Sequence, residues 1–172
     1  MTTATEYLSC TDTAKLVRAH LRAAFPAVKF SVRSSVYSGG ASIDVSWTDG
    51  PRTSRVKRIT DLLEGATFDG MVDLKSYHDT VLVGPAGPRS VHLGADFIFH
   101  QRHMTNEADL TAQAAEIIRT RCATEGTPPN DRFGNEWVND LARAMVLALD
   151  FEKEPSLQET FKEVVLRETS SA

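Results

Sequence analysis

The spacing of hydrophobic residues along the first 64 positions predicts a helix, two strands and a second helix. Apolar side chains recur three and four positions apart over 16–25, as on one face of a helix, and Pro26 ends that helix. Residues 28–33 and 41–48 alternate apolar and polar side chains, which indicates two strands with one buried face each. The helical spacing returns over 52–64.

The segment between the two predicted strands, SSVYSGG (34–40), contains two glycines. We expect it to be a hairpin connection that is longer than a tight two-residue turn. Trp47 is in phase with Ile43 and Val45, so its indole is expected in the core. Tyr37 lies in the connection and is the better candidate for an exposed aromatic side chain.

The rest of the chain predicts shorter elements and then a helical end. We expect an extended segment at 73–77, a Gly-Pro-rich loop at 84–88, a strand at 90–100 and a helix at 106–121. EGTPPNDRFGN (125–135) is typical of a linker, because paired prolines with Gly, Asn and Asp disfavour both helix and strand. Two further helices are expected at 136–151 and 156–168.

In this order the elements predict an α+β fold, in which a small antiparallel sheet packs with helices (helix-strand-strand-helix-strand-helix) before a C-terminal helical pair. We expect an α+β domain over 1–124 and a linker with a C-terminal helical extension over 125–172. The order also suits a type II KH domain, and GPAG (84–87) has the GxxG spelling. A KH loop lies between helices and offers basic residues to phosphates, so the KH interpretation is disfavoured.

No apolar run approaches the roughly 18 residues that a membrane helix needs. The N-terminal residues MTTATEYLSC lack the basic start and apolar core of a signal peptide. We therefore expect a cytoplasmic protein with no membrane contact. Its two cysteines, Cys10 and Cys122, are expected to stay reduced.

Charge is distributed unevenly along the chain. The net charge of −4 argues against a general nucleic-acid binder. Residues 1–60 nevertheless hold nine Lys and Arg against four Asp and Glu, whereas the remainder holds ten basic and 19 acidic residues. This asymmetry marks either a basic docking face or two solvated faces that differ in charge.

A basic surface is expected on the first helix and on the hairpin that follows it. Lys15, Arg18 and Arg22 are three and four positions apart, so they share one helix face. If the protein binds nucleic acid, these side chains and Lys29 would neutralise phosphates, while an exposed aromatic ring could stack on a base. The predicted binding residues are Arg18, Arg22, Arg33, Ser35, Tyr37, Arg52 and Arg55.

FDGMVDLKSYHD (68–79) gathers several acids, a tyrosine and a histidine. A carboxylate beside a histidine can form a general acid–base pair or part of a metal site, but a polar edge strand with its turn accounts for the same residues. Cys10, just ahead of the first helix, is either an activated thiol or a small buried side chain.

Histidines near the third strand are weak candidates for metal ligands. On a single strand His92, Asp96 and His100 would share one face, with His103 following, and such a set can bind zinc or manganese. Histidines at a strand end or a helix cap are the structural alternative. No catalytic residue can be assigned, GGAS (39–42) lacks a Walker lysine, and no cofactor is expected.

Four segments carry a family resemblance: YLSC-x-x-TAKLVR, FPAVKFSVRSSVYSGGASIDVSWTDGP, FDGMVDLKSYHD and GADFIFHQRH. Over roughly residues 7–103 the chain resembles the large polyvalent protein-associated domain family, number 29 of that series, of phages and plasmids. That family usually occurs as a module of very long proteins that enter a host cell with incoming DNA, and the chain resembles its small stand-alone versions. The resemblance implies a mobile-element protein acting in the bacterial cytoplasm, and it supplies no catalytic residues.

Our main hypothesis is a non-enzymatic interaction protein of a phage or plasmid that inhibits a host defence system, for example as an anti-CRISPR. Its partner would be a host defence protein complex, docked on the hairpin connection and the basic helix face. A nucleic-acid-binding accessory of mobile-element DNA transfer and a metal-dependent enzyme stay open as alternatives. The C-terminal helices could form a homodimer interface or cover the core.

Overall fold

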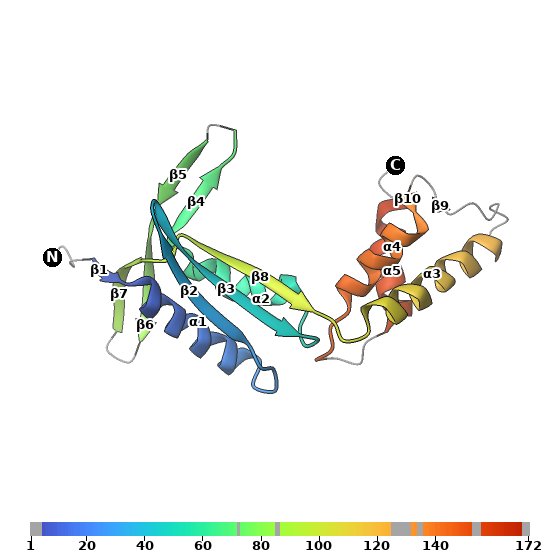
Figure 1. Cartoon of the computed structure of the whole chain (residues 1–172), viewed down its shortest axis with the longest axis horizontal. Coiled ribbons are helices and arrows are strands. Elements are labelled where there is room, and N and C mark those ends of the chain that lie inside the picture. Colours follow the sequence, from blue (N-terminus) through green and yellow to red (C-terminus); the bar gives the residue numbers. More distant parts are fainter. Residues whose placement is uncertain are drawn as a thin grey trace. The chain divides into compact units, whose positions relative to one another are not determined.

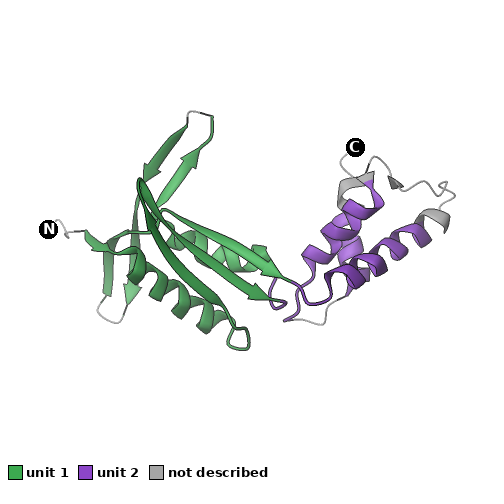
Figure 2. Cartoon of the chain, viewed as in Figure 1, with its two compact units in different colours: residues 1–48, 53–103 green, residues 49–52, 104–172 purple. Residues whose placement is uncertain are grey.

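The computed structural model describes residues 5–71, 73–84, 87–124, 132–133, 136–152 and 156–169. By contact the chain forms two compact units, coloured separately in Figure 2: unit 1 (Met1–Thr48 and Thr53–His103) and unit 2 (Asp49–Arg52 and Met104–Ala172). Each unit has its own hydrophobic core. The expected domain boundary at 124/125 stays a prediction.

The main sheet of unit 1 has the strand order β2 (Ser31–Tyr37), β3 (Gly40–Thr48), β8 (Phe97–His103). β2 and β3 are antiparallel, whereas β3 and β8 are parallel. The helices α1 (Cys10–Ala24) and α2 (Thr53–Thr60) cover one face of this sheet (Figure 1). The alternate residues of β3 point toward the helices, as its sequence pattern predicts. The buried side chains between these layers include Val17, Leu21, Ile43, Val45, Trp47 and Val56.

A second sheet and a hairpin complete unit 1. The second sheet has the order β1 (Glu6–Leu8), β7 (Gly87–Leu93), β6 (Asp79–Gly84), with β1 parallel to β7. β4 (Ala66–Asp69) and β5 (Leu74–Tyr77) form an antiparallel hairpin that projects from the unit (Figure 1). The β7 residues Val91 and Leu93 join the same core as α1 and β3.

Glycines occur where two backbone segments of unit 1 come close together. A Cβ atom on Gly65 would collide with the carbonyl oxygen of Leu93, and one on Gly94 would lie 2.5 Å from the carbonyl oxygen of Leu8. The Gly65 amide donates to the carbonyl of Ala95 (2.8 Å), so this close approach is fixed by hydrogen bonding. It places β4 beside the turn that joins β7 to β8.

The described residues of unit 2 form the helices α3 (Glu107–Thr124), α4 (Val138–Ala148) and α5 (Leu157–Thr169), with two-residue strands β9 (Arg132–Phe133) and β10 (Glu136–Trp137). The 49–52 loop belongs to this unit, because Asp49 accepts hydrogen bonds from the amide (3.0 Å) and hydroxyl (2.7 Å) of Thr105. The core side chains of this unit include Ile118, Leu141, Met145 and Phe161.

The α+β class and the C-terminal helical pair are confirmed, and the sheets are mixed because β1 and β8 each pair in parallel. The expected long hairpin connection is wrong. Tyr37 pairs with Gly40, so only Ser38 and Gly39 form the turn, and Gly39 adopts a φ of 97° that suits glycine.

Two other expectations differ from the structure. Within the expected loop at 84–88, the described residues belong to strands: Gly84 of β6 pairs with Gly87 of β7, and Pro88 pairs with Val83. The expected strand at 90–100 is two strands, because the chain turns between Leu93 and Phe97. The expected linker at 125–135 lies outside the described residues apart from Arg132–Phe133. Among the helices that the structure describes, none is long and apolar enough to cross a membrane.

Candidate functional site

The predicted binding residues are divided between the two units. Arg52 belongs to unit 2, where its guanidinium pairs with Glu163 (2.8 Å). Arg55 lies over the ring of Phe25 on the helical side of unit 1, with 5.2 Å from its Cζ atom to the ring centroid. The other five predicted residues, which α1 and β2 carry, are Arg18, Arg22, Arg33, Ser35 and Tyr37.

A basic pocket lies at the C-terminal end of α1. Arg18, Arg22 and Lys29 line this cavity of about 360 Å³, and its described lining residues include no acidic side chain. Nη2 of Arg18 donates to the carbonyl oxygen of Val32 (2.6 Å), which places its guanidinium at the outer edge of β2. The pocket therefore adjoins the start of β2.

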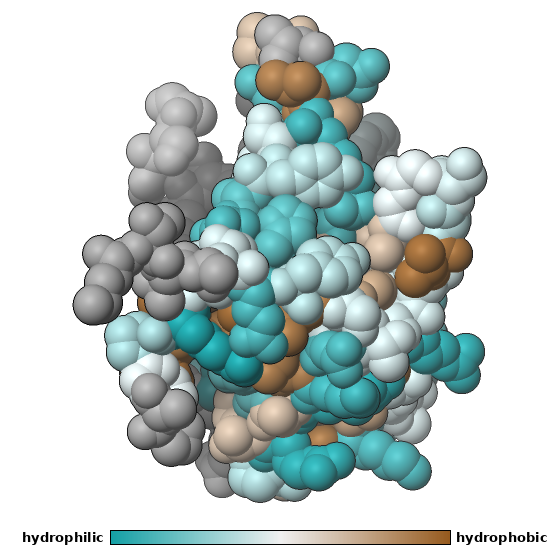
Figure 3. Space-filling view, turned by 90° about the vertical axis from the view of Figure 1, so that its left-hand side faces the viewer, coloured by the Kyte–Doolittle hydropathy of each residue, from teal (hydrophilic) through white to brown (hydrophobic). Residues whose placement is uncertain are grey.

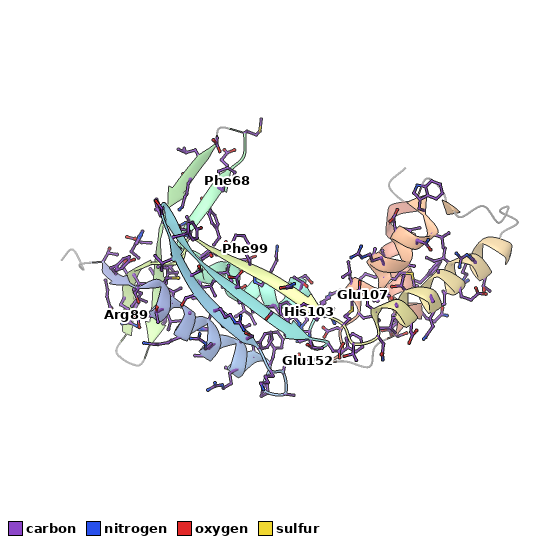
Figure 4. All side chains as sticks on the ribbon, in the orientation of Figure 1. Phe68, Arg89, Phe99, His103, Glu107 and Glu152 are labelled. Carbon is purple, nitrogen blue, oxygen red and sulfur yellow. The ribbon has the colours of Figure 1, made fainter. Side chains whose placement is uncertain are left out.

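The face of the main sheet opposite the helices carries hydroxyl, charged and aromatic side chains; we call it the open face. Figure 4 labels Phe99 on β8, where its side chain is 54% exposed. The ring centroids of Phe97 and Phe99 are 6.5 Å apart. Strand pairing arranges this face in three rows: Ser35–Ser42–Phe97, Arg33–Asp44–Phe99 and Ser31–Ser46–Gln101.

One end of the open face is held by an ion pair whose carboxylate, Asp96, is buried. Nζ of Lys75 on β5 lies 2.6 Å from Oδ2 of Asp96, and that oxygen also accepts a hydrogen bond from the amide of Ala41 (2.8 Å). The hydrogen bond to Asp96 raises the pKa of Lys75, and one to Tyr77 adds to this. A Cβ atom on Gly40 would collide with the same carboxylate. The pair therefore ties the β4–β5 hairpin to the first residues of β3.

Residues 66–77, the β4–β5 hairpin, form an exposed apolar arm, which we call the hairpin arm. Met71 is 96% exposed, and Phe68, Leu74 and Tyr77 are each more than half exposed. In Figure 3 hydrophobic atoms lie on the projecting end of the arm, and Figure 4 labels Phe68 on β4. Asp69 caps the turn by accepting the amide of Met71 (2.9 Å).

The predicted acid–base segment 68–79 is thus largely this arm and does not converge on a single point. Asp79 does meet a histidine, but from another strand: its Oδ1 lies 3.1 Å from Nδ1 of His92. His92 also stacks on Tyr7, with 5.9 Å between ring centroids. This is an exposed cross-strand contact, of the kind that stabilises sheets.

The histidines that sequence suggests as metal ligands lie apart. The expected common face of His92, Asp96 and His100 is wrong, because a turn separates β7 from β8. His103 ends β8 opposite Thr48 (Figure 4). Within the described parts of the chain, no three His, Cys, Asp or Glu side chains gather as metal ligands do.

Cys10 is a buried residue at the start of α1. Its Sγ lies 3.5 Å from the carbonyl oxygen of Ser42, and burial raises the pKa of the thiol. A raised pKa disfavours the thiolate, so the structure supports the buried-side-chain interpretation. The side chain of Cys122 lies outside the described residues.

Acidification is expected to destabilise unit 1 through His100. This ring accepts or donates a hydrogen bond with Oγ1 of Thr60 (2.7 Å), and burial lowers its pKa. Burial makes His100 harder to protonate in the folded state than in the unfolded state. The neutral ring therefore contributes its full stability above the unfolded pKa of about 6.5, and this contribution is lost as pH falls below that value.

The urea midpoint of the wild type should therefore fall between about pH 7 and pH 5 by more than that of His100→Gln, whose amide keeps a bond to Thr60. The comparison is needed because burial raises the pKa of Glu64, which acts in the opposite direction. If the urea midpoints of the two proteins fall equally over this pH range, His100 is not the cause of the loss of stability.

The exposed rings of Phe68 and Phe99 were not among the predicted site residues. The available signal was FIF (97–99), which places two rings on one strand face with Ile98 on the other. Only the packing of Ile98 against the core shows which face is free.

The family model described as large polyvalent protein associated domain 29 matches residues 8–105. That range contains the basic pocket, the open face and the hairpin arm. Neither the curated proteins nor the solved structures contain a match.

Proposed function

Because this chain belongs to the large polyvalent protein associated domain 29 family, we propose that it is an anti-defence interaction protein of a phage or plasmid. In this proposal it catalyses no reaction and acts in the bacterial cytoplasm. It binds a host defence protein complex, such as a CRISPR effector, and blocks it. Its association with phages or plasmids follows from the family itself.

The observation that carries this proposal is the hairpin arm. Phe68, Met71, Leu74 and Tyr77 lie on a two-stranded projection and are mostly exposed. Phe68 and Tyr77 share one face of the hairpin, Leu74 lies on the other face and Met71 follows the end of β4, so the arm presents apolar side chains on both faces. Aromatic residues and methionine are enriched in protein-binding surfaces. Burial of one such side chain in a partner contributes about 1.5–3 kcal/mol.

The base of the arm is rigid, which limits the entropy lost on binding. The Lys75–Asp96 pair holds β5, and the amide of Ala66 donates to the carbonyl of Asp96 (3.3 Å). An arm that is ordered before it meets its partner binds more tightly than a flexible one with the same contacts.

The double variant Phe68→Ala/Leu74→Ala is expected to lose partner binding by at least about 30-fold, because two anchoring side chains are removed. The measurement is affinity purification of the tagged chain from a bacterium with an active CRISPR system, with the captured subunits identified. A plasmid-interference assay in the same cells then measures whether interference is blocked.

The matched control is Val83→Ala, which truncates an exposed apolar residue on β6, away from the arm. It should retain capture and inhibition, and both variants should keep the wild-type melting temperature. If the double variant captures the defence complex as well as the wild type does, the arm is not the interface. If the wild type captures no defence subunit and leaves interference intact, the proposed function is wrong for that system.

A further inference from the structure

We propose that the open face and the basic pocket together bind single-stranded nucleic acid. A base stacks on Phe99, beside Phe97, while phosphates lie along the edge of β2 on Arg33 and on the pocket. This activity goes beyond the protein partner proposed for the hairpin arm and uses a different surface of unit 1.

The aromatic pair provides the stacking surface. Phe97 and Phe99 are two residues apart on β8, so both rings lie on the open face, and their centroids are 6.5 Å apart. The intervening Ile98 packs in the core, on the opposite face of β8 from the two rings. Phe99 is the exposed ring, whereas Phe97 is half-buried and the Lys75 ammonium lies 5.6 Å from its ring centroid. Exposed aromatic rings on a sheet face bind unpaired bases with little dependence on sequence, so a base stacks on Phe99.

The cations lie at a distance that suits a nucleotide backbone. Arg33 is in the same row as Phe99, two strand spacings away, or about 10 Å. Arg18, Arg22 and Lys29 continue this positive charge past the start of β2. A strand whose bases reach the rings would therefore carry its phosphates along four basic side chains.

The surface between the rings and the cations is made of small side chains. Ser31, Ser35 and Ser46 leave room for a sugar or base edge and offer hydroxyl groups for hydrogen bonds. Asp44 is the acidic member of the rows and lies between Arg33 and Phe99. It repels phosphate from the centre of the face, which favours the β2 edge as the backbone path.

These features favour a single strand over a duplex. Stacking on a protein ring requires a base face that is not already paired and stacked in a helix. The chain has a net charge of −4, and four cations are few for duplex binding that depends on charge alone. The shared chemistry fits DNA and RNA, so the test uses both.

The test is titration calorimetry of the full chain with oligothymidine and oligouridine of about 12 nucleotides, and with a duplex of equal length. Both single strands, or one of them, should bind at about 50 mM salt, more tightly than the duplex. Four phosphate contacts predict a slope of about −3 for log K against log salt concentration. Tighter binding of the thymidine or the uridine strand identifies the nucleic acid.

Three substitutions test the geometry. Phe99→Ala should weaken binding about 5- to 100-fold, the effect of losing one stacked base. Arg33→Ala should weaken binding and reduce the salt slope by about 0.7, whereas Asp44→Asn should strengthen binding. Each variant should unfold at the wild-type urea concentration, because these side chains are exposed.

Phe68→Ala is the matched control, because it removes an exposed ring from the hairpin arm. It should leave oligonucleotide affinity unchanged while it weakens capture of a defence complex, so this inference and the proposed function can fail separately. The inference is overturned if neither strand binds at about 100 µM protein, if the duplex binds more tightly, or if Phe99→Ala binds like the wild type. It is also overturned if Phe99→Ala removes only protein capture, which would make this face a protein interface.

Discussion

Replacing Asp96 by alanine is expected to lower the free energy of unfolding of unit 1 by about 1–3 kcal/mol. The carboxylate is buried and binds both the Lys75 ammonium and the Ala41 amide. Its loss leaves the Ala41 amide without its acceptor, whereas the partly exposed Lys75 ammonium can turn to water. Urea denaturation measures the change. The arm is expected to lose its fixed base as well, so partner capture should weaken.

The control is Asp44→Ala, which removes an exposed carboxylate from the middle of β3 and should change stability by less than about 0.5 kcal/mol. A loss of under about 1 kcal/mol for Asp96→Ala would mean that water or a shifted side chain replaces both contacts.

Gly65→Ala is expected to destabilise unit 1 by about 3 kcal/mol, because the new methyl group collides with the Leu93 carbonyl oxygen. Both sides of this contact are backbone, and neither can yield easily. The Gly65 amide donates to Ala95 (2.8 Å) and its carbonyl accepts from His78 (3.1 Å), so the segment is held from two directions.

Gly84→Ala provides the comparison, since nothing lies within 4 Å of a Cβ atom at that position. It should unfold at nearly the wild-type urea concentration. Equal midpoints for the two alanine variants would show that the β4 segment shifts away from β7 at little cost.

Local sequence patterns predicted the helices and strands that have one buried face and one exposed face. The period-two alternation of β3 matches its buried face, and the Ser9 hydroxyl caps α1 by accepting the amide of Asp12 (3.1 Å). The second half of β2 was missed because neither face of it is buried. Ser34 to Tyr37 pair with β3 through backbone hydrogen bonds, and such pairing leaves no hydrophobic signature.

The candidate sites depend on contacts that local patterns do not contain. Lys75 and Asp96 are 21 residues apart in sequence, and their pairing requires the turn between β7 and β8. The spacing of Phe97 and Phe99 indicated one common face, but it could not indicate which face α1 and α2 would cover. The two strands of the hairpin arm expose both faces, so the apolar residues there lack the alternation by which half-buried strands are identified.

The two tryptophans of the chain lie in different units and in opposite environments. Trp47 is 2% exposed in the core of unit 1, whereas Trp137 of unit 2 is 52% exposed. A buried indole emits light at shorter wavelength than one in water, so opening of unit 1 should shift the Trp47 emission to the red, with a smaller change from Trp137. Intrinsic fluorescence of the unmodified chain can therefore follow the unfolding of unit 1 without an attached dye.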